Sequence, residues 1–486
     1  MPEPLVFDLS KKGRKGYTLN SLDVPEKNIN ELIPPELLRD SPARLPEIGE
    51  SEAMRHFVRL SNMNHHVDKS LYPLGSCTMK YNPKVNENNA ALPGFTGVHP
   101  RQPEETVQGC LEVIYEVENI LKEVTGLKGV TSQPAAGSHG EFTGIMLMRK
   151  YHEVKGNDRT TILIPDSAHG TNPSSVAIAG YSVKEIKSNE KGTIDLDDFK
   201  SNLTDDVAGL MVTNPNTLGI FECDIAEIAD ILHEKDALLY MDGANLNALL
   251  GILKPGDLGV DVLHINLHKT FSTPHGGGGP GSGPVAVSEK LVDFLPVPGV
   301  KKEGNKFSFD YDIPNTIGKI HGFYGNFGII IRALTYMDML GKRGMRRVSE
   351  NAILNANYLL HHIRDYYKLE YDSPVMHEFV VSSVWQKEKG IKTLDIAKRL
   401  LDYGFHAPTT YFPLIVKEAL MIEPTETEVK EVLDCFAGAM KEISEDVDKD
   451  PEMLKHAPYI TPVRRLDEVK ATKELNVKYA FAEDEK

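Results

Sequence analysis

Lys269 has the sequence context of a nucleophile. It follows the apolar run 260–267 and precedes the glycine-rich stretch 276–283. The apolar run predicts a short buried strand, and the glycines predict a mobile flap or a tight chain reversal at the mouth of a site. Burying an unpaired ammonium is unfavourable, so such a lysine tends to lose its proton, and a neutral amine attacks carbonyl groups and forms Schiff bases.

A carboxylate, Asp242, ends a second predicted strand, 237–241, about 27 residues before Lys269. Parallel strands of an open sheet bring their carboxyl ends to one edge, so we expect the acid and the amine to meet there. This pair suits pyridoxal phosphate, because a carboxylate keeps the pyridinium nitrogen protonated and a lysine carries the aldehyde. Taken alone, a lysine is most often a solvated loop residue. The expected position of Lys269 at the same sheet edge as Asp242 favours a cofactor-binding site instead.

A turn of small residues is suited to binding an anion. Ala136, Gly137 and Ser138 precede the apolar segment 141–148, which is predicted to be helical. Backbone amides at a helix start point toward an anion, and the helix dipole adds a favourable potential. We assign phosphate binding to these three residues, although the turn matches neither the P-loop nor the dinucleotide-binding glycine pattern.

Two further polar residues, His169 and Asn214, follow predicted strands of the same series. A lone histidine at a strand end is more often a capping or core residue than a cofactor contact. His169 becomes a candidate because it is expected at the same sheet edge as Asn214, Asp242 and Lys269.

The histidines show no metal-binding pattern. His65 and His66 are adjacent, so their side chains point to opposite faces of an extended segment. His264 and His268 are four residues apart on a predicted strand, where this spacing gives no convergence. The sequence therefore predicts no metal site.

Composition narrows the class of protein. The chain has 486 residues, 41% of them hydrophobic, and a net charge of −16, which argues against nucleic acid and anionic membranes as partners. No basic-plus-apolar leader and no bilayer-length apolar run are present, so a cytoplasmic location is expected. The four cysteines form no CxxC pair and are expected to be reduced thiols.

The pattern along the chain predicts four regions. Between 160 and 290, apolar strands alternate with helical segments, which indicates an α/β fold with a mostly parallel sheet. A capping box at 425–428 predicts the start of a late helix. The expected regions are an N-terminal arm with a site-lining loop (1–100), a large α/β domain (101–325), a small α+β domain (326–446) and a tail (447–486).

Seven motifs in order make the chain recognisable. They are 72–80 (YPLGSCTMK), 133–137 (QPAAG), 167–173 (SAHGTNP), 213–219 (TNPNTLG), 241–245 (MDGAN), 266–270 (NLHKT) and 421–426 (MIEPTE). Together they resemble glycine decarboxylase, the P protein of the glycine cleavage system. Several motifs in the correct order are far more specific than any single one.

The resemblance implies a pyridoxal-phosphate aminotransferase-like fold of type I. It also implies glycine dehydrogenase (aminomethyl-transferring) activity: glycine is decarboxylated and its aminomethyl group passes to the lipoamide of the H protein. The chain is about half the length of the single-chain form and holds the lysine-bearing half, so it is similar to subunit 2 of the two-subunit form. A companion subunit 1 is then implied, in a heterotetramer with two copies of each.

The resemblance also assigns roles on the two faces of the cofactor ring. Lys269 would form the Schiff base with pyridoxal phosphate, and Asp242 would pair with the pyridinium nitrogen. Ala244 would pack against one ring face and His169 would stack on the other.

Around the ring, the resemblance places Asn214 in hydrogen-bonding distance of the ring hydroxyl. Ser138 and Gly137, with Ala136, would hold the phosphate. No carboxylate-binding arginine is evident late in the chain, which disfavours transamination and suits a substrate whose carboxylate leaves.

Two alternatives stay open at this point. Another pyridoxal-phosphate enzyme of fold type I, such as a hydroxymethyltransferase or a desulfurase, would share Asp242 and Lys269, and a requirement for a lipoylated carrier separates the two. The chain could also be a catalytically silent scaffold subunit, which would stay colourless with pyridoxal phosphate.

Overall fold

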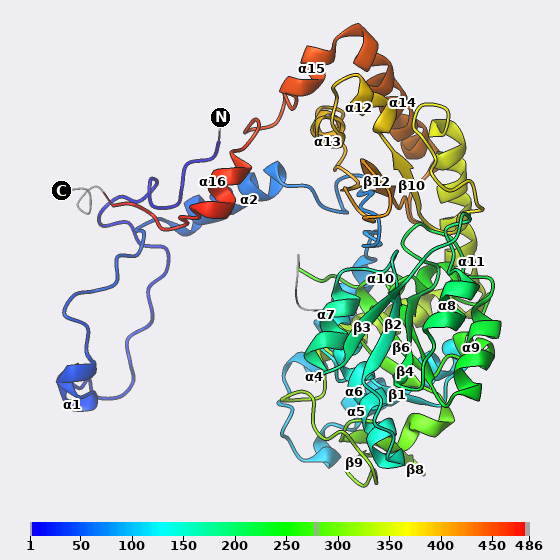
Figure 1. Cartoon of the computed structure of the whole chain (residues 1–486). Helices are drawn as coiled ribbons and strands as arrows, with labels where there is room; N and C mark the ends of the chain where they lie inside the picture. The colour runs from blue at the N-terminus through cyan, green and yellow to red at the C-terminus, as the bar shows by residue number, and fades with distance from the viewer. Residues whose placement is uncertain (1, 277–278, 280, 482–486) are drawn as a thin grey trace. The chain divides into compact units, whose positions relative to one another are not determined.

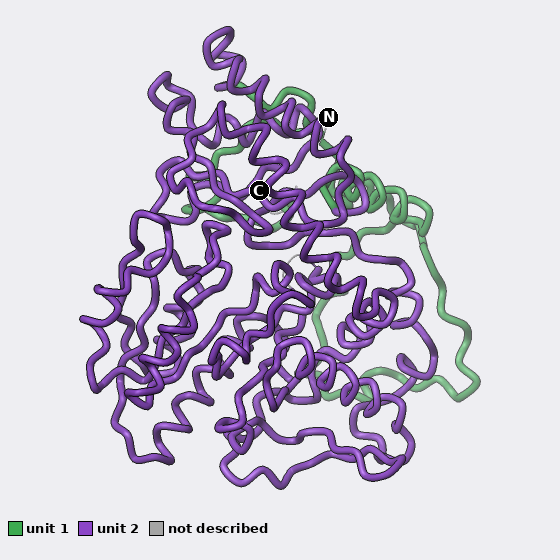
Figure 2. Tube along the Cα trace, turned by 90° about the vertical axis from the view of Figure 1, so that its right-hand side faces the viewer, with its two compact units in different colours: residues 1–66, 456–486 green, residues 67–455 purple. Residues whose placement is uncertain are grey.

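The computed structural model describes residues 2–276, 279 and 281–481. The chain forms two compact units, one made of 1–66 with 456–486 and the other of 67–455 (Figure 2). Residues 277, 278 and 280 of the predicted glycine flap lie outside the described residues. The four regions expected from the sequence stay a prediction.

The smaller unit combines both ends of the chain. Glu3 anchors the N-terminus, because its Oε1 lies 2.7 Å from Arg59 Nη2 and 3.1 Å from His56 Nδ1. The ring of Phe7 stacks on that of Tyr479 with centroids 4.7 Å apart. The helices of this unit are α1 (Ile29–Leu32), η1 (Pro35–Leu37), α2 (Glu50–Met63) and α16 (Glu468–Lys473).

The smaller unit exposes several large apolar side chains. Tyr17, Leu19 and Val477 are 81%, 86% and 84% exposed. Single exposed apolar side chains are ordinary, but a series of them along one segment is typical of a surface that another molecule covers.

A seven-stranded sheet organises the larger unit, with strand order β1-β7-β6-β5-β4-β2-β3. The pairs β3/β2, β2/β4, β4/β5 and β5/β6 are parallel, and β7 is antiparallel to both β6 and β1. The mostly parallel sheet predicted from the sequence is confirmed. The strands are β1 (Gly129–Thr131), β2 (Thr161–Pro165), β3 (Ser182–Ile186), β4 (Val207–Thr213), β5 (Leu238–Gly243), β6 (Val262–Ile265) and β7 (Val285–Val287).

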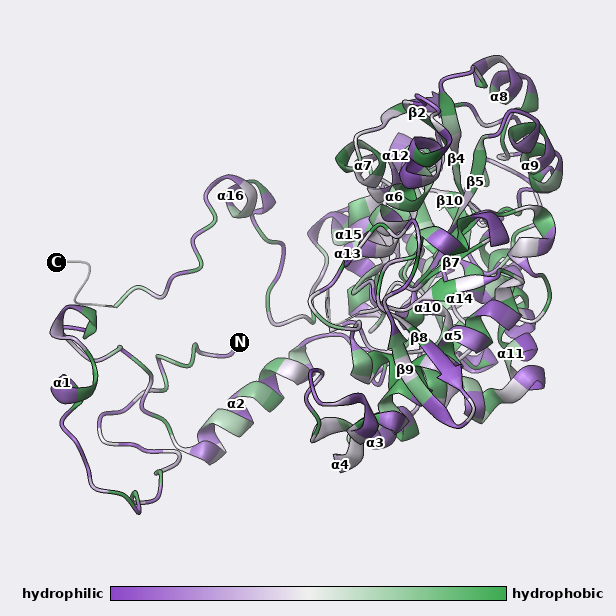
Figure 3. Ribbon diagram, turned by 90° about the horizontal axis from the view of Figure 1, so that it is seen from below, coloured by the Kyte–Doolittle hydropathy of each residue, from purple (hydrophilic) through white to green (hydrophobic). Residues whose placement is uncertain are grey.

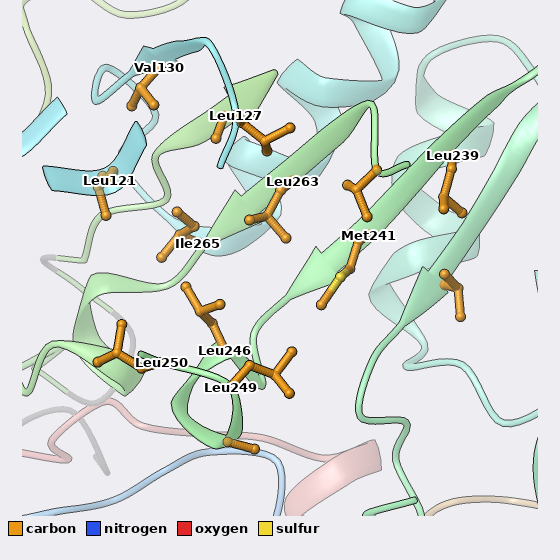
Figure 4. Packing of buried hydrophobic residues seen from close by; sticks show 14 of the residues in the cluster. Leu121, Leu127, Val130, Leu239, Met241, Leu246, Leu249, Leu250, Leu263 and Ile265 are labelled. Carbon is orange, nitrogen blue, oxygen red and sulfur yellow. The ribbon is translucent and has the colours of Figure 1, made fainter. Parts of the chain in front are cut away.

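Side chains alternate along the central strands and so divide the core into two layers. On β5, Leu239 and Met241 pack into one hydrophobic cluster with Leu263 of β6 (Figure 4), whereas Leu238 and Tyr240 pack into a second cluster on the opposite face. Both faces are apolar, as in sheets that helices cover on two sides. Figure 3 shows that β4 and β5 consist mostly of hydrophobic residues.

Helices cover both faces of this sheet, with α6 and α7 on one side and α8 and α9 on the other (Figure 1). The helix predicted over 103–126 is α5, and it ends at Gly126, which has a left-handed φ of 73°. The bounds are α5 (Gln108–Thr125), α6 (Gly137–Lys155), α7 (Thr171–Ile178), α8 (Leu196–Asn202) and α9 (Ile225–Glu234).

The chain then leaves the large sheet through a β8–β9 hairpin and the long helix α11, whose regular geometry breaks at Gly341. A second, three-stranded sheet follows in the order β10-β12-β11, with its own hydrophobic cluster. The bounds are β8 (Gly299–Glu303), β9 (Lys306–Asp310), α11 (Phe327–Ile363), β10 (Phe379–Ser382), α12 (Val384–Glu388), α13 (Thr393–Asp402), β11 (Thr409–Thr410), β12 (Ala419–Ile422), α14 (Lys430–Lys449) and α15 (Pro451–His456).

Two local predictions are wrong. The predicted strand 260–267 ends early, because β6 stops at Ile265 and Lys269 lies in the single helical turn α10 (Leu267–Thr270). The predicted capping box at 425–428 does not open a helix: α14 begins at Lys430, and Thr425 has a φ of 65°. In both places the chain forms a tight turn where the sequence predicted a continuing strand or the start of a helix.

Two further features bear on the class of protein. Within the described part of the chain, no helix combines the length and apolar character that crossing a bilayer requires. The four cysteines, Cys77, Cys110, Cys223 and Cys435, are free thiols.

Replacing Leu239 by Ala should destabilise the larger unit by about 2–5 kcal/mol, because this fully buried side chain lies at the centre of the core and its loss leaves a cavity. Leu414→Ala is the matched control, since Leu414 is 85% exposed and should change stability by less than about 0.5 kcal/mol. Urea unfolding followed by circular dichroism measures both. Equal effects of the two changes would contradict the placement of β5 in the core.

Candidate active site

A cavity of about 580 Å³ opens at the carboxyl ends of β4, β5 and β6. Its lining includes the last residues of these strands, the start of α6, the loop after β2 and the loop at Ser76 and Cys77. The carboxyl edge of a parallel sheet is where open α/β folds bind ligands, since the loops that follow the strands converge there.

Asp242 lies at the end of β5, and its carboxylate is buried but well supported. Asn172 Nδ2 donates to its Oδ2 at 3.0 Å, the amide of Ala244 donates to its Oδ1 at 2.9 Å, and His264 Nε2 lies 3.2 Å from Oδ1. Burial alone would raise the pKa of Asp242, but His264, the Asn172 amide and the Lys269 charge outweigh it and lower the pKa. The group is therefore a buried anion.

Lys269 lines the same cavity from the helical turn α10. Its Nζ donates a hydrogen bond to the carbonyl oxygen of Ser76 at 2.8 Å. The amine and the Asp242 carboxylate therefore line one cavity, as expected because β5 carries Asp242 and the adjacent parallel strand β6 leads into the turn that carries Lys269. This arrangement places a nucleophile and an anion within reach of one ligand.

His169 also lines the cavity and is held by its neighbours. Its Nδ1 lies 2.9 Å from Thr171 Oγ1, and that hydroxyl donates to Glu141 Oε1 at 2.9 Å. Burial and the nearby Lys269 charge lower the pKa of His169, which favours a neutral ring. A neutral ring is suited to packing against a flat aromatic ligand.

The predicted phosphate cradle lies at the N-terminus of α6. Ala136 is the N-cap residue, Gly137 is the first helical residue, and both line the cavity together with Ser138. A Cβ on Gly137 would lie 2.6 Å from Asn266 Oδ1, so a larger residue at this position would require the Asn266 side chain to shift. The free amides of a 19-residue helix point at this end of the cavity.

Asn214 is the one predicted site residue that does not line the cavity. Its side chain is fully buried, and its Oδ1 accepts a hydrogen bond from the amide of Glu222 at 3.1 Å. Its neighbours Thr213 and Thr217 line the cavity instead. Ala244, by contrast, lines it, as expected from its place after Asp242.

Sequence reasoning missed the role of His264. We considered it only as a metal ligand, yet it lies opposite Asp242 in the β5–β6 register and close to that carboxylate. Its other ring nitrogen lies 2.9 Å from the hydroxyl of Tyr240. The signal was present, because residues that end adjacent parallel strands are neighbours.

His268 also lines the cavity. Burial, followed by the charge of Lys269, lowers its pKa to about 3, so the ring is neutral at physiological pH. Its buried Nδ1 has no hydrogen-bond partner among the described residues.

The cavity fits pyridoxal phosphate by the chemistry of its lining. Thr213 Oγ1 and Asn266 Oδ1 are, like His268 Nδ1, buried atoms of the described lining without hydrogen-bond partners, which indicates that a polar ligand satisfies them. The anion at Asp242 suits a pyridinium nitrogen, the amine of Lys269 suits an aldehyde, and the start of α6 suits a phosphate.

The fold is that of the pyridoxal-phosphate enzymes of fold type I. A crystal structure described as glycine decarboxylase (P-protein) of the glycine cleavage system, in inhibitor-bound form, matches with a TM-score of 0.72 at 20% identity, over 87% of this chain and 100% of that one. A sphingosine-1-phosphate lyase of Burkholderia pseudomallei and a NifS-like protein each match with a TM-score of 0.60, at 12% and 14% identity and over 90% and 77% of this chain. The matched regions make up 95% of the lyase chain and 99% of the NifS-like chain.

Sequence comparison identifies the family. The family described as "Glycine cleavage system P-protein" matches residues 15–303, and "Glycine dehydrogenase, C-terminal domain" matches 348–459. A "Probable glycine dehydrogenase (decarboxylating) subunit 2" of Chloroherpeton thalassium is 60% identical over 100% of this chain and 99% of its own length. Its counterpart in Caldanaerobacter subterraneus is 57% identical over 96% and 97%. The chain belongs to the glycine cleavage system P-protein family, which confirms the resemblance inferred from the motifs.

The buried carboxyl group of Glu118 leads to a prediction about pH. Glu118 Oε1 accepts hydrogen bonds from the amide (3.0 Å) and hydroxyl (2.9 Å) of Ser132. Burial raises the pKa of Glu118 to about 7, although the Ser132 hydrogen bonds oppose this shift. Between about pH 4.3 and 7 the folded chain keeps this proton and the unfolded chain loses it, so stability falls as pH rises.

Glu118→Gln should remove this loss. Relative to the parent chain, the variant should gain up to about 3 kcal/mol in unfolding free energy between pH 4.5 and 7.5. Urea unfolding across this pH range measures the difference, and Glu112→Gln on the exposed face of the same helix is the control. A pH profile parallel to that of the parent chain would show that Glu118 titrates normally in the fold.

Proposed function

We propose that this chain catalyses the pyridoxal-phosphate-dependent decarboxylation of glycine and the transfer of the aminomethyl group to the lipoamide of the H protein. The observation that carries the proposal is the shared cavity of Asp242 and Lys269 at the sheet edge. It occurs in a chain that is 60% identical, over its whole length, to a probable subunit 2 of glycine dehydrogenase (decarboxylating).

The residues of the chain would divide the work as follows. Lys269 would bind the aldehyde, Asp242 would keep the pyridinium nitrogen protonated, and Ala136, Gly137 and Ser138 would hold the phosphate. Bound pyridoxal phosphate supplies an electron sink for the pair of electrons left when CO2 departs. Asp242 supports this sink only while it is an anion, which its three partners ensure.

His169 and Ala244 would enclose the ring from its two faces, as both line the cavity. The roles of these residues are part of the proposal. Asn214 does not belong to the described lining of the cavity, so its hydrogen bond to the ring hydroxyl stays a prediction.

The absence of a cationic clamp supports decarboxylation. No arginine belongs to the described lining of the cavity. An arginine paired with the substrate carboxylate would stabilise the ground state more than the departing, neutral CO2, and such binding does not accelerate the chemical step. A cavity of this kind therefore suits a substrate that loses its carboxylate.

The second step transfers the aminomethyl group to the lipoyl disulfide. The carbon that lost CO2 forms a bond to one sulfur of the lipoyl disulfide, the S–S bond breaks, and the other sulfur leaves as a thiol. The disulfide is reduced as the aminomethyl carbon is oxidised. The partners proposed for this reaction are the lipoylated H protein and a companion subunit 1, in a cytoplasmic heterotetramer with two copies of each chain.

Lys269→Ala should abolish the visible absorbance of the chain loaded with pyridoxal phosphate, together with glycine-dependent CO2 release, because no amine is left to bind the aldehyde. Lys235→Ala is the matched control, because Lys235 is exposed and distant from Lys269 in the sequence. It should leave the absorbance and the CO2 release unchanged. Absorbance spectra with and without glycine test this in the assembled protein. Survival of both signals in Lys269→Ala would rule out the assignment.

Asp242→Asn should reduce kcat by about 100- to 1000-fold, because a neutral amide would no longer hold the pyridinium nitrogen protonated, and this loss corresponds to about 3–4 kcal/mol of transition-state stabilisation. The variant should still bind the cofactor through Lys269, so its colour should persist while turnover falls. Asp205→Asn, at a 95% exposed side chain, is the control. Full activity in Asp242→Asn would exclude the proposed pyridinium contact.

The identity of the acceptor separates the remaining alternatives. Glycine-dependent CO2 release should require the lipoylated H protein and the companion subunit, and H protein without lipoate should not support it. A hydroxymethyltransferase would instead cleave serine without the carrier, and a silent scaffold would bind no pyridoxal phosphate. Radiolabelled CO2 release with each component omitted in turn, together with serine cleavage and the absorbance of bound pyridoxal phosphate, distinguishes the three.

A further inference from the structure

A buried polar cluster lies beside the cavity but outside its lining. His377 and Glu378 precede β10, and Glu423 follows β12, so the antiparallel pairing of these strands brings the three side chains together. All three are fully buried. His377 Nε2 lies 3.8 Å from a carboxylate oxygen of Glu378 and 3.8 Å from one of Glu423. Nothing in the proposed reaction uses these groups.

The two carboxyl groups hold one loop of the backbone. The amide of Ser76 donates to Glu378 Oε2 at 2.6 Å, and the amide of Thr78 donates to Glu423 Oε2 at 2.9 Å. Ser76 and Thr78 have φ values of 63° and 47°, a left-handed conformation that is unfavourable for residues with a Cβ. Such a conformation persists only where its surroundings fix it.

The same loop is fixed to the three-stranded sheet at Gly75. The amide of Gly75 donates to the carbonyl of Met421 at 3.3 Å, and Thr409 Oγ1 donates to the carbonyl of Gly75 at 2.8 Å. A Cβ on Gly75 would lie 2.7 Å from the Met421 carbonyl oxygen, so the contact is close. The loop is therefore positioned by strands that carry no cavity residue.

The far end of the loop reaches α10 through a buried cation. Lys80 Nζ lies 2.7 Å from Glu426 Oε1 and donates to the carbonyl of Thr270 at 3.0 Å. Thr270 is the residue after Lys269. The loop thus contacts the lysine turn twice, once through Lys80 and once through Ser76, whose carbonyl accepts the hydrogen bond from Lys269 Nζ.

We propose that Glu378 and Glu423 are positioning residues for Lys269: they hold the loop 75–78 in its left-handed conformation, so that the Ser76 carbonyl orients the lysine amine toward the cavity. The inference rests on the proposed function only in taking Lys269 as the lysine that binds the cofactor. The geometry of the loop is independent of that role.

The electrostatics of the cluster agree with a structural task. Burial raises the pKa of Glu378 well above its usual range, and burial raises the pKa of Glu423 to about 7. Burial also lowers the pKa of His377 to about 3, so its ring is neutral. A neutral carboxyl group keeps a carbonyl oxygen that accepts from a backbone amide, and the pair avoids two adjacent buried charges.

The test is a double-mutant cycle on the cofactor-free chain. Glu423→Met fills the same space without the acceptor, and Thr78→Gly lets the backbone adopt a positive φ without support. Glu423→Met should speed amide hydrogen exchange in 75–80 about 10-fold and speed the reductive methylation of Lys269 by formaldehyde and cyanoborohydride severalfold. Adding Thr78→Gly should bring both rates most of the way back to those of the parent chain. Glycine adopts a positive φ without the hydrogen bond to Glu423.

Two controls separate positioning from packing. Glu423→Gln keeps an acceptor oxygen and should behave as the parent chain does. Glu222→Met removes another buried carboxyl, whose bonds to Ile194 and Asn216 lie elsewhere, and should leave 75–80 unchanged. Both rates are read by mass spectrometry of peptides, so neither depends on catalysis.

Three results would each overturn the proposal. They are unchanged exchange and methylation in folded Glu423→Met, equal changes in Glu222→Met, and additive losses in the double variant with Thr78→Gly. Should Glu423→Met not fold, the cycle of Glu378→Met with Ser76→Gly makes the same test. Because the cofactor is absent throughout, a failure here leaves the colour of the loaded enzyme, and hence the proposed function, unaffected.

Discussion

The structure depends on keeping one buried carboxylate ionised. Asp242 is 3% exposed, and burial by itself would favour its protonated form. The amide of Asn172, the backbone of Ala244 and the ring of His264 reverse that preference. These partners come from α7, from the turn after β5 and from the adjacent strand β6. The topology of the sheet therefore supplies the electrostatic environment that the site needs.

The helices that cover both faces of the sheet also bury the strand that carries this carboxylate. Leu239 and Met241 are buried on one face of β5 and Tyr240 on the other, so the strand that ends in Asp242 has no contact with solvent along its length. A strand buried in this way is held rigidly at native packing density. Its terminal carboxylate is then presented in one orientation, which a partly solvated edge strand would not ensure.

Much of this could be predicted because the signals are local. The alternation of strands with helices gave the mostly parallel sheet, and the positions of Asp242 and Lys269 at strand ends placed both at one edge. The turn at Lys269 and the left-handed Thr425 were missed, since tertiary contacts fix them. The ties from Glu378 and Glu423 to the loop span 302 and 345 residues, and no local pattern reports such a contact.

The apolar surface of the smaller unit has a practical consequence. Side chains such as Leu19, Leu45 and Val477 are 75–86% exposed. Exposed apolar surface that no other molecule covers favours self-association. We therefore expect solubility, rather than the folding of the sheet, to limit how much of the isolated chain can be obtained.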